Sequence, residues 1–139
     1  MNWKLILQLS LFGLAMGVCT VFFIPSTVEP LFWLVIFAIS AYLIVRRSPG
    51  RYFTHGVLVG LANSVWVTGA HLLLFHQYAA NHPREMAMLA STAMATHPRL
   101  TMLLTGPVIG LLSGVVLGLF ALVASRMLGV ARRPAVPAA

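Results

Sequence analysis

The chain has 139 residues, of which 60% are hydrophobic and only 8% are charged, and its net charge is +7. Soluble domains carry about 25% charged residues, so a water-exposed fold could not cover its surface with so few. The positive charge does not predict nucleic-acid binding, because the basic residues lie in short clusters between long apolar runs. We therefore expect the lipid bilayer, and no nucleic acid, around this chain.

Four apolar stretches divide the sequence, and each is long enough to cross a bilayer as a helix, which takes about 20 residues. They cover residues 4–24, 29–46, 53–78 and 100–128. Only helices and closed barrels satisfy the backbone in lipid, and the sequence lacks the alternating pattern of barrel strands. It therefore predicts an all-α, polytopic membrane protein. We expect one four-helix transmembrane domain, 1–128, and a mobile cytoplasmic tail, 129–139.

The connection between the first two stretches carries two competing signals for a helix start. Ser26 and Glu29 have the spacing of a capping box, in which Ser26 is the N-cap and Glu29 reaches back. Glu29 is equally suited to be the N-cap itself, with Pro30 in the first helical position. Both arrangements place the start of the second helix near Glu29.

The connection between the third and fourth stretches, residues 79–99, is the longest. Its middle part, residues 85–95, is rich in Met and Ala, which favour helix formation. Several apolar side chains fall on one face of that helix: Met86, Leu89, Ala90 and Ala93. We expect a short amphipathic helix that lies on the membrane surface between the third and fourth spans.

Basic residues are distributed unequally between the two sides of the predicted bundle. With the N-terminus in the cytoplasm, the cytoplasmic side holds seven of them: Lys4, Arg46, Arg47, Arg51, Arg126, Arg132 and Arg133. The opposite side holds only Arg84 and Arg99. Because Lys and Arg in short loops favour the cytoplasmic side, we expect a multi-pass protein of the inner (plasma) membrane with both termini in the cytoplasm.

Glycines recur at a spacing of four residues in three of the stretches: Gly13 and Gly17, Gly56 and Gly60, and Gly106, Gly110, Gly114 and Gly118. Residues four apart lie on nearly the same helix face, and small residues let helix backbones approach closely in lipid. These faces either pack helices within the chain or form a glycine zipper with a second copy or a larger membrane complex. The spacing alone leaves both interpretations open.

The third stretch is the most polar one, and it holds Asn63, Ser64, Thr68 and His71. Ser64, Thr68 and His71 lie within about 60° of one another on a helix. Polar side chains inside a membrane either hydrogen-bond between helices or mark a functional site. The stripe therefore predicts interhelical hydrogen bonds or a polar pocket.

Catalytic signals are missing from the sequence. No Asp, Glu, Lys or Arg lies in the middle of an apolar stretch, and motifs such as Gly-x-Ser-x-Gly and His-Glu-x-x-His are absent. Proton-coupled transporters usually need a titratable group inside the membrane, and histidine is the only candidate type here. We therefore expect no enzymatic activity and assign no catalytic residue.

Histidine and methionine gather toward the non-cytoplasmic side: His71, His76, His82 and His97, with Met86, Met88, Met94 and Met102. Imidazole and thioether ligands suit copper. However, His71 and His76 are five residues apart and leave different helix faces, and methionine also fills packing gaps. We therefore assign no metal ligand and no cofactor from the sequence.

These patterns support three functional hypotheses. The leading one is a non-enzymatic accessory or assembly subunit that packs through its glycine faces in a homo-oligomer or a larger complex. The first alternative is a small transporter or permeability factor that uses the polar face of the third helix. The second alternative is a metal or haem binder on the non-cytoplasmic face.

Overall fold

The computed structural model describes residues 1–92 and 94–129, and every regular element in them is a helix. The helices are α1 (Trp3–Phe22), α2 (Glu29–Arg47), α3 (Tyr52–Leu73), α4 (Phe75–Asn81), α5 (Pro83–Ala90) and α6 (Pro98–Met127). Four of them, α1, α2, α3 and α6, are long and apolar enough to cross a membrane. The predicted all-α, four-span architecture with a short helix before the last span is therefore confirmed. The predicted tail lies outside the described residues except for Gly129.

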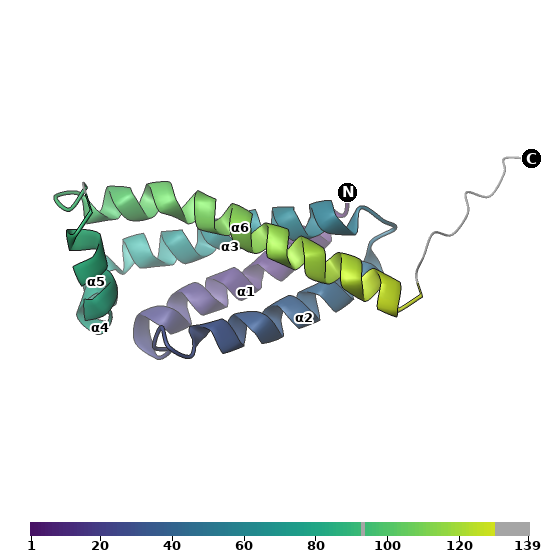
Figure 1. Cartoon of the computed structure of the whole chain (residues 1–139), viewed down its shortest axis with the longest axis horizontal. Coiled ribbons are helices and arrows are strands. Elements are labelled where there is room, and N and C mark those ends of the chain that lie inside the picture. Colours follow the sequence, from purple (N-terminus) through teal and green to yellow (C-terminus); the bar gives the residue numbers. More distant parts are fainter. Residues whose placement is uncertain (93, 130–139) are drawn as a thin grey trace, which may run out of the picture.

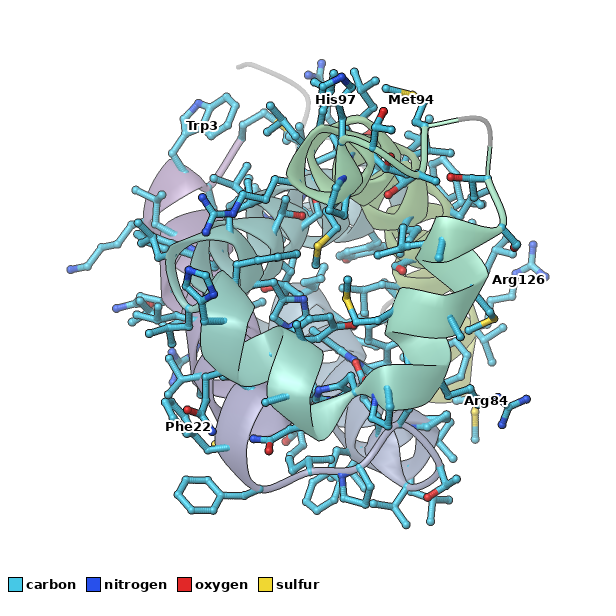
Figure 2. All side chains as sticks on the ribbon, turned by 90° about the vertical axis from the view of Figure 1, so that its left-hand side faces the viewer. Trp3, Phe22, Arg84, Met94, His97 and Arg126 are labelled. Atoms are coloured by element: carbon cyan, nitrogen blue, oxygen red, sulfur yellow. The ribbon has the colours of Figure 1, made fainter. Side chains whose placement is uncertain are left out.

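The four long helices form a bundle in which α3 packs against both α1 and α6, while α2 packs mainly on α6 (Figure 1). The short helices α4 and α5 lie across one end of this bundle, which we call the α4–α5 end (Figure 1). Figure 2 looks onto that end. The opposite end, which we call the basic end, carries Lys4, Arg46, Arg47, Arg51 and Arg126.

Hydrogen bonds at the basic end connect three helices. The side chain of Asn2 caps α1 by accepting a hydrogen bond from the amide of Leu5, and its Nδ2 donates to the carbonyl of Arg47. The amide of Asn2 donates to Nε2 of His55, whose Nδ1 lies 2.9 Å from the carbonyl of Arg51. Both nitrogens of this buried imidazole therefore have partners, and His55 acts as a structural link between α1 and α3.

The apolar core lies in the half of the bundle nearest the basic end. It consists of Leu5, Ile6, Leu9, Ala41, Ile44, Val59, Leu117 and Ala121. The buried residues of α2 all fall in its second half, from Ser40 to Val45. The first half of α2 is exposed or only partly buried. Helix α2 is thus packed tightly near the basic end and more loosely toward the α4–α5 end.

The third helix is shorter than the sequence predicts. Instead of running from 53 to 78, α3 ends at Leu73, and the chain turns at Leu74 into the separate helix α4. The polar residues of α4 lie beyond the apolar span, and Asn81 Nδ2 donates a 2.8 Å hydrogen bond to the carbonyl of Val21. This contact holds α4 against the end of α1. The other three spans lie within a few residues of their predicted bounds.

The start of α2 also differs from both predicted caps. Helix α2 begins at Glu29, and its N-cap residue is Val28, without a side-chain hydrogen bond to the helix. The carboxylate of Glu29 does not reach back toward Ser26. Oε1 of Glu29 instead accepts a 2.9 Å hydrogen bond from Nε1 of Trp33, one turn farther along the helix. Glu29 remains favourable in this first turn because a carboxylate there complements the helix dipole.

Candidate ligand-binding cavity

A cavity of about 820 Å³ lies between α2, α3 and α6 and extends to the α4–α5 end. Its walls come from the first half of α2, one face of α3 and the part of α6 from Thr101 to Phe120, and residues of α4 and α5 line it at the end. Ligand sites in proteins usually occupy about 300–1,000 Å³, so this volume suits a drug-sized molecule. The loose packing of the first half of α2 leaves the space between these helices.

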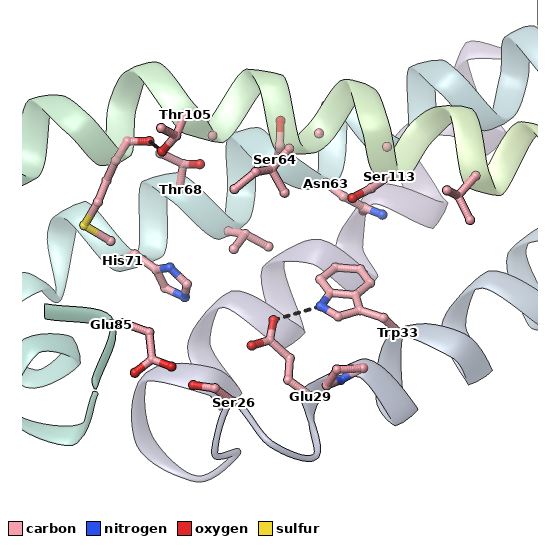
Figure 3. A pocket seen from close by; sticks show the side chains of 18 of the residues that line it. Ser26, Glu29, Trp33, Asn63, Ser64, Thr68, His71, Glu85, Thr105 and Ser113 are labelled. Atoms are coloured by element: carbon pink, nitrogen blue, oxygen red, sulfur yellow. Dashed lines mark hydrogen bonds between the residues drawn. The ribbon is translucent and has the colours of Figure 1, made fainter. Parts of the chain in front are cut away.

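The four residues of the predicted polar stripe, Asn63, Ser64, Thr68 and His71, all line this cavity (Figure 3). Asn63 is 4% exposed, and its Oδ1 accepts a 3.2 Å hydrogen bond from the amide of Gly13. Its Nδ2 has no hydrogen-bond partner among the described residues. A buried donor without a partner costs about 1–3 kcal/mol, so Asn63 offers an unused hydrogen bond to a molecule in the cavity.

Four hydroxyl groups along the cavity use their protons within their own helix or turn. Ser64 donates to a backbone carbonyl at 2.8 Å, Thr105 at 2.9 Å and Thr101 at 3.2 Å. Thr92, beyond the end of α5, does the same at 2.8 Å. A hydroxyl that has spent its proton presents only lone pairs. These four side chains therefore add hydrogen-bond acceptors, and no donors, to the lining.

Two carboxylates stand near the α4–α5 end of the cavity, and Figure 3 shows Glu29, Glu85 and Ser26 around the same space. Glu29 accepts from the indole of Trp33 at 2.9 Å. A hydrogen bond from the Ser26 side chain holds the pKa of Glu85 below its ordinary value, and His82 and Arg84 act in the same direction. The partners that hold these carboxylates, an indole and a hydroxyl, are neutral.

The sequence did not predict Glu29 and Glu85 as site residues. The sequence patterns indicate only a helix start at Glu29 and only a short surface helix around Glu85, and the two residues are 56 positions apart. One signal was available: they are the only two acidic residues in a chain of net charge +7.

Three rings stack at the α4–α5 end, and two of them, His71 and Tyr78, line the cavity. The ring of Tyr78 lies 4.3 Å from that of His71 and 4.3 Å from that of His82, measured between centroids. Burial raises the pKa of Tyr78 to about 12, and the charges of Glu85 and Glu29 add to this shift. The phenol is therefore neutral at physiological pH. Nε2 of His71 lies 2.9 Å from Oγ1 of Thr20, so the stack is also tied to α1.

The cavity is open at the side of the bundle. Leu34 on α2 and Ile109 on α6 both line it, and they are 53% and 60% exposed. Apolar side chains on the outside of membrane-spanning helices face lipid. The cavity is therefore accessible from the hydrocarbon of the bilayer between α2 and α6.

All eight glycines that the sequence singled out are buried between helices of the same chain. Gly13 and Gly17 of α1 lie against α3, where Gly13 meets Asn63. On the other side, α3 and α6 approach through Gly56 against Gly118 and Gly60 against Gly114. Gly110 and Gly106 receive the side chains of Ser64 and Thr68. The glycine faces thus hold α3 against both neighbours, and within the described residues they present no surface to a partner.

The histidines do not gather into a metal-ligand group. Among residues 1–92 and 94–129, no three His, Cys, Asp or Glu side chains come together at metal-binding range. His71 and His82 lie on opposite sides of Tyr78, whereas His76 and His97 line a separate small pocket next to Arg99.

The fold and the cavity define a class: an integral membrane four-helix bundle with a laterally open cavity in the half of the bundle away from the basic end. Comparison of the chain with protein-family models, with curated protein sequences and with solved structures gave no match. The functional argument therefore rests on the cavity itself.

Proposed function

We propose that this protein is a non-enzymatic membrane protein that binds a small amphiphilic molecule in the cavity between α2, α3 and α6. The observation that carries this proposal is the joint lining of one cavity by an apolar wall and by the polar stripe of α3, with Nδ2 of Asn63 unpaired. An amphiphile would place its apolar part toward Leu34 and Ile109. Its polar part would lie at the α4–α5 end.

The packing of the opposite half favours binding over open conduction. The core residues from Leu5 to Ala121 fill the bundle near the basic end, where Val59 and Leu117 are fully buried. A solute in the cavity would therefore meet close-packed side chains before reaching the basic end. This supports a receptor or carrier of amphiphiles, and a transporter would have to separate these core contacts.

The charge distribution supports an orientation for this site. We place both termini and the basic end in the cytoplasm, and the protein in the inner (plasma) membrane, since basic residues favour the cytoplasmic side. The cavity then lies in the outer half of the bilayer. Its ligand would be taken from the outer leaflet.

An accessory role remains compatible with this proposal, although the glycine faces do not support it. A partner subunit would have to contact the lipid-facing residues of the bundle, because the eight glycines already pack within the chain. A partner could then sense whether the cavity is filled, but nothing in the lining requires one.

The proposal is tested by filling the cavity. Three probes that share an octyl chain, octyltrimethylammonium, 1-octanol and octyl sulfate, are titrated by calorimetry into nanodiscs that hold the protein, with empty nanodiscs as the blank. We expect saturable binding of at least one probe. Ser113→Phe, which places a ring in the cavity, should abolish it. Leu112→Phe is the matched control, because Leu112 is exposed and does not line the cavity.

If no probe binds saturably, or if Ser113→Phe and Leu112→Phe bind equally well, the proposed binding function is wrong. Circular dichroism of each variant confirms that the helices are retained. The test is therefore independent of which probe binds best.

A further inference from the structure

The charges near the α4–α5 end are separated between the cavity and its surroundings. Four charged side chains lie beyond the basic half: Glu29, Glu85, Arg84 and Arg99. Both glutamates line the cavity, and neither arginine does. Arg84 points away from the bundle in Figure 2, and the guanidinium of Arg99 lies over the ring of Phe75, 4.9 Å from its centroid. Within residues 1–92 and 94–129, the lining thus carries two glutamates and no arginine or lysine.

Four hydroxyl groups of the lining have the same bias. The hydroxyls of Ser64, Thr92, Thr101 and Thr105 donate to backbone carbonyls and present lone pairs. Nε1 of Trp33 is occupied by Glu29. The buried donor left without a partner is Nδ2 of Asn63, deeper in the cavity. The lining therefore stabilises a positive charge near the α4–α5 end. Farther in, Asn63 can donate one hydrogen bond to a ligand.

We propose that the ligand of this cavity is a cationic amphiphile. Its positively charged group would lie between Glu29 and Glu85, an oxygen acceptor would receive Nδ2 of Asn63, and its apolar body would extend toward Leu34 and Ile109. This inference rests on the proposed binding function and names the chemical class of its ligand. Trp33 also lines this part of the cavity, and the face of an indole ring attracts cations.

Structural roles alone do not account for both carboxylates. Glu29 is favourable at the start of α2 because of the helix dipole. The same argument holds for Glu85 in the first turn of α5. Carboxylates that face water would interact with the helix dipole equally well. Instead the two helices direct both side chains to one cavity, together with the buried, unpaired amide of Asn63 on α3. Three helices thereby contribute polar groups to a single site.

An anionic amphiphile does not fit this lining. Its head group would face the two carboxylates and the hydroxyl lone pairs of Ser64, Thr92, Thr101 and Thr105. Carboxylates attract a cationic head group and repel an anionic one, so the lining distinguishes ligands of opposite sign.

The experiment compares the three octyl probes on the full chain in nanodiscs. We expect octyltrimethylammonium to bind at least about tenfold more tightly than 1-octanol, and octyl sulfate to bind most weakly. Glu29→Gln and Glu85→Gln, singly and together, should remove most of the preference for the cation over 1-octanol. Arg84→Gln is the control, because it alters the charge of the same loop outside the lining, and the preference should persist.

The outcomes separate the two proposals. If the three probes bind equally in the unmodified protein, or if the double glutamine variant keeps the full cation preference, the cationic class is wrong while binding in the cavity stands. If no probe binds saturably, the proposed function falls and this inference falls with it. If the double variant fails to fold, the same comparison is made with a single glutamine variant that retains its helices.

Discussion

The backbone amide of Gly13 on α1 donates a 3.2 Å hydrogen bond to Oδ1 of Asn63 on α3, inside the membrane-spanning part of the bundle. This contact needs a glycine, because a Cβ at position 13 would lie 2.6 Å from the Cα of Asn63. It also fixes the orientation of the Asn63 amide, whose Nδ2 has no hydrogen-bond partner among the described residues. A packing contact between two helices thereby orients a group of the candidate site.

Asn63→Ala should destabilise the bundle by about 1 kcal/mol, the usual value of an interhelical hydrogen bond in a membrane. The measurement is the fraction of folded protein against the mole fraction of SDS. Ser40→Ala is the contrast: Ser40 is fully buried, and its hydroxyl has no partner among the described residues. Its removal should leave the stability unchanged or raise it, and a larger loss for Ser40→Ala than for Asn63→Ala would contradict this assignment.

Gly60→Ala should destabilise the bundle by about 1–3 kcal/mol, the usual cost of overpacking. A Cβ at Gly60 would fall on the backbone of Gly114, which cannot move without separating α3 from α6. Gly69→Ala on the same helix is the matched control, because a Cβ there meets nothing within 4 Å. The control should be neutral or stabilising by up to about 1 kcal/mol, as Ala is the better helix former. Equal SDS unfolding curves for the two variants would argue against this close approach.

Ser26→Ala should raise the pKa of Glu85 toward its ordinary value of 4.5. The depressed pKa means that the contact adds stability above this ordinary value and that this stability is lost as the pH falls through the pKa of the folded state. Carboxyl ¹³C NMR of the protein labelled at glutamate measures the shift directly, since the chain has only two acidic residues. The Glu29 signal serves as the internal reference, and an unchanged Glu85 titration would exclude the Ser26 contact.

Reporter fusions test the orientation. A reporter placed after Ala139 or inserted at Pro49 should report a cytoplasmic location, and one inserted after Ser91 should report the opposite side. The reverse pattern would overturn the charge argument. It would also move the cavity to the cytoplasmic leaflet without changing its lining.

Hydropathy and length were sufficient to predict the four spans, because a bilayer demands about 20 apolar residues per helix. The break at Leu74 was not predictable in the same way. The apolar character continues through Phe75, and the turn depends on contacts made by α4, such as the bond from Asn81 to Val21. Local sequence contains no information about such a distant acceptor.

The glycine and polar patterns indicated important faces but not the neighbours of those faces. Periodicity places Ser64 and Thr68 on one side of α3, whereas their opposition to Gly110 and Gly106 depends on which helix packs there. The cavity depends in addition on the loose packing of the first half of α2. For the same reason, spacing within either segment could not show that Glu29 and Glu85 line the same cavity.

The lateral opening between Leu34 and Ile109 changes the reference state for any ligand. A molecule that enters from the bilayer replaces lipid acyl chains in the cavity and does not leave water. Because lipid tails are as apolar as leucine, burying its apolar part gains little free energy. The affinity of a ligand then depends on how much better its head group binds to the polar end of the cavity than the head groups of the surrounding lipids do. The selectivity of this protein would accordingly vary with the lipid composition of its membrane, even for a cavity of fixed shape.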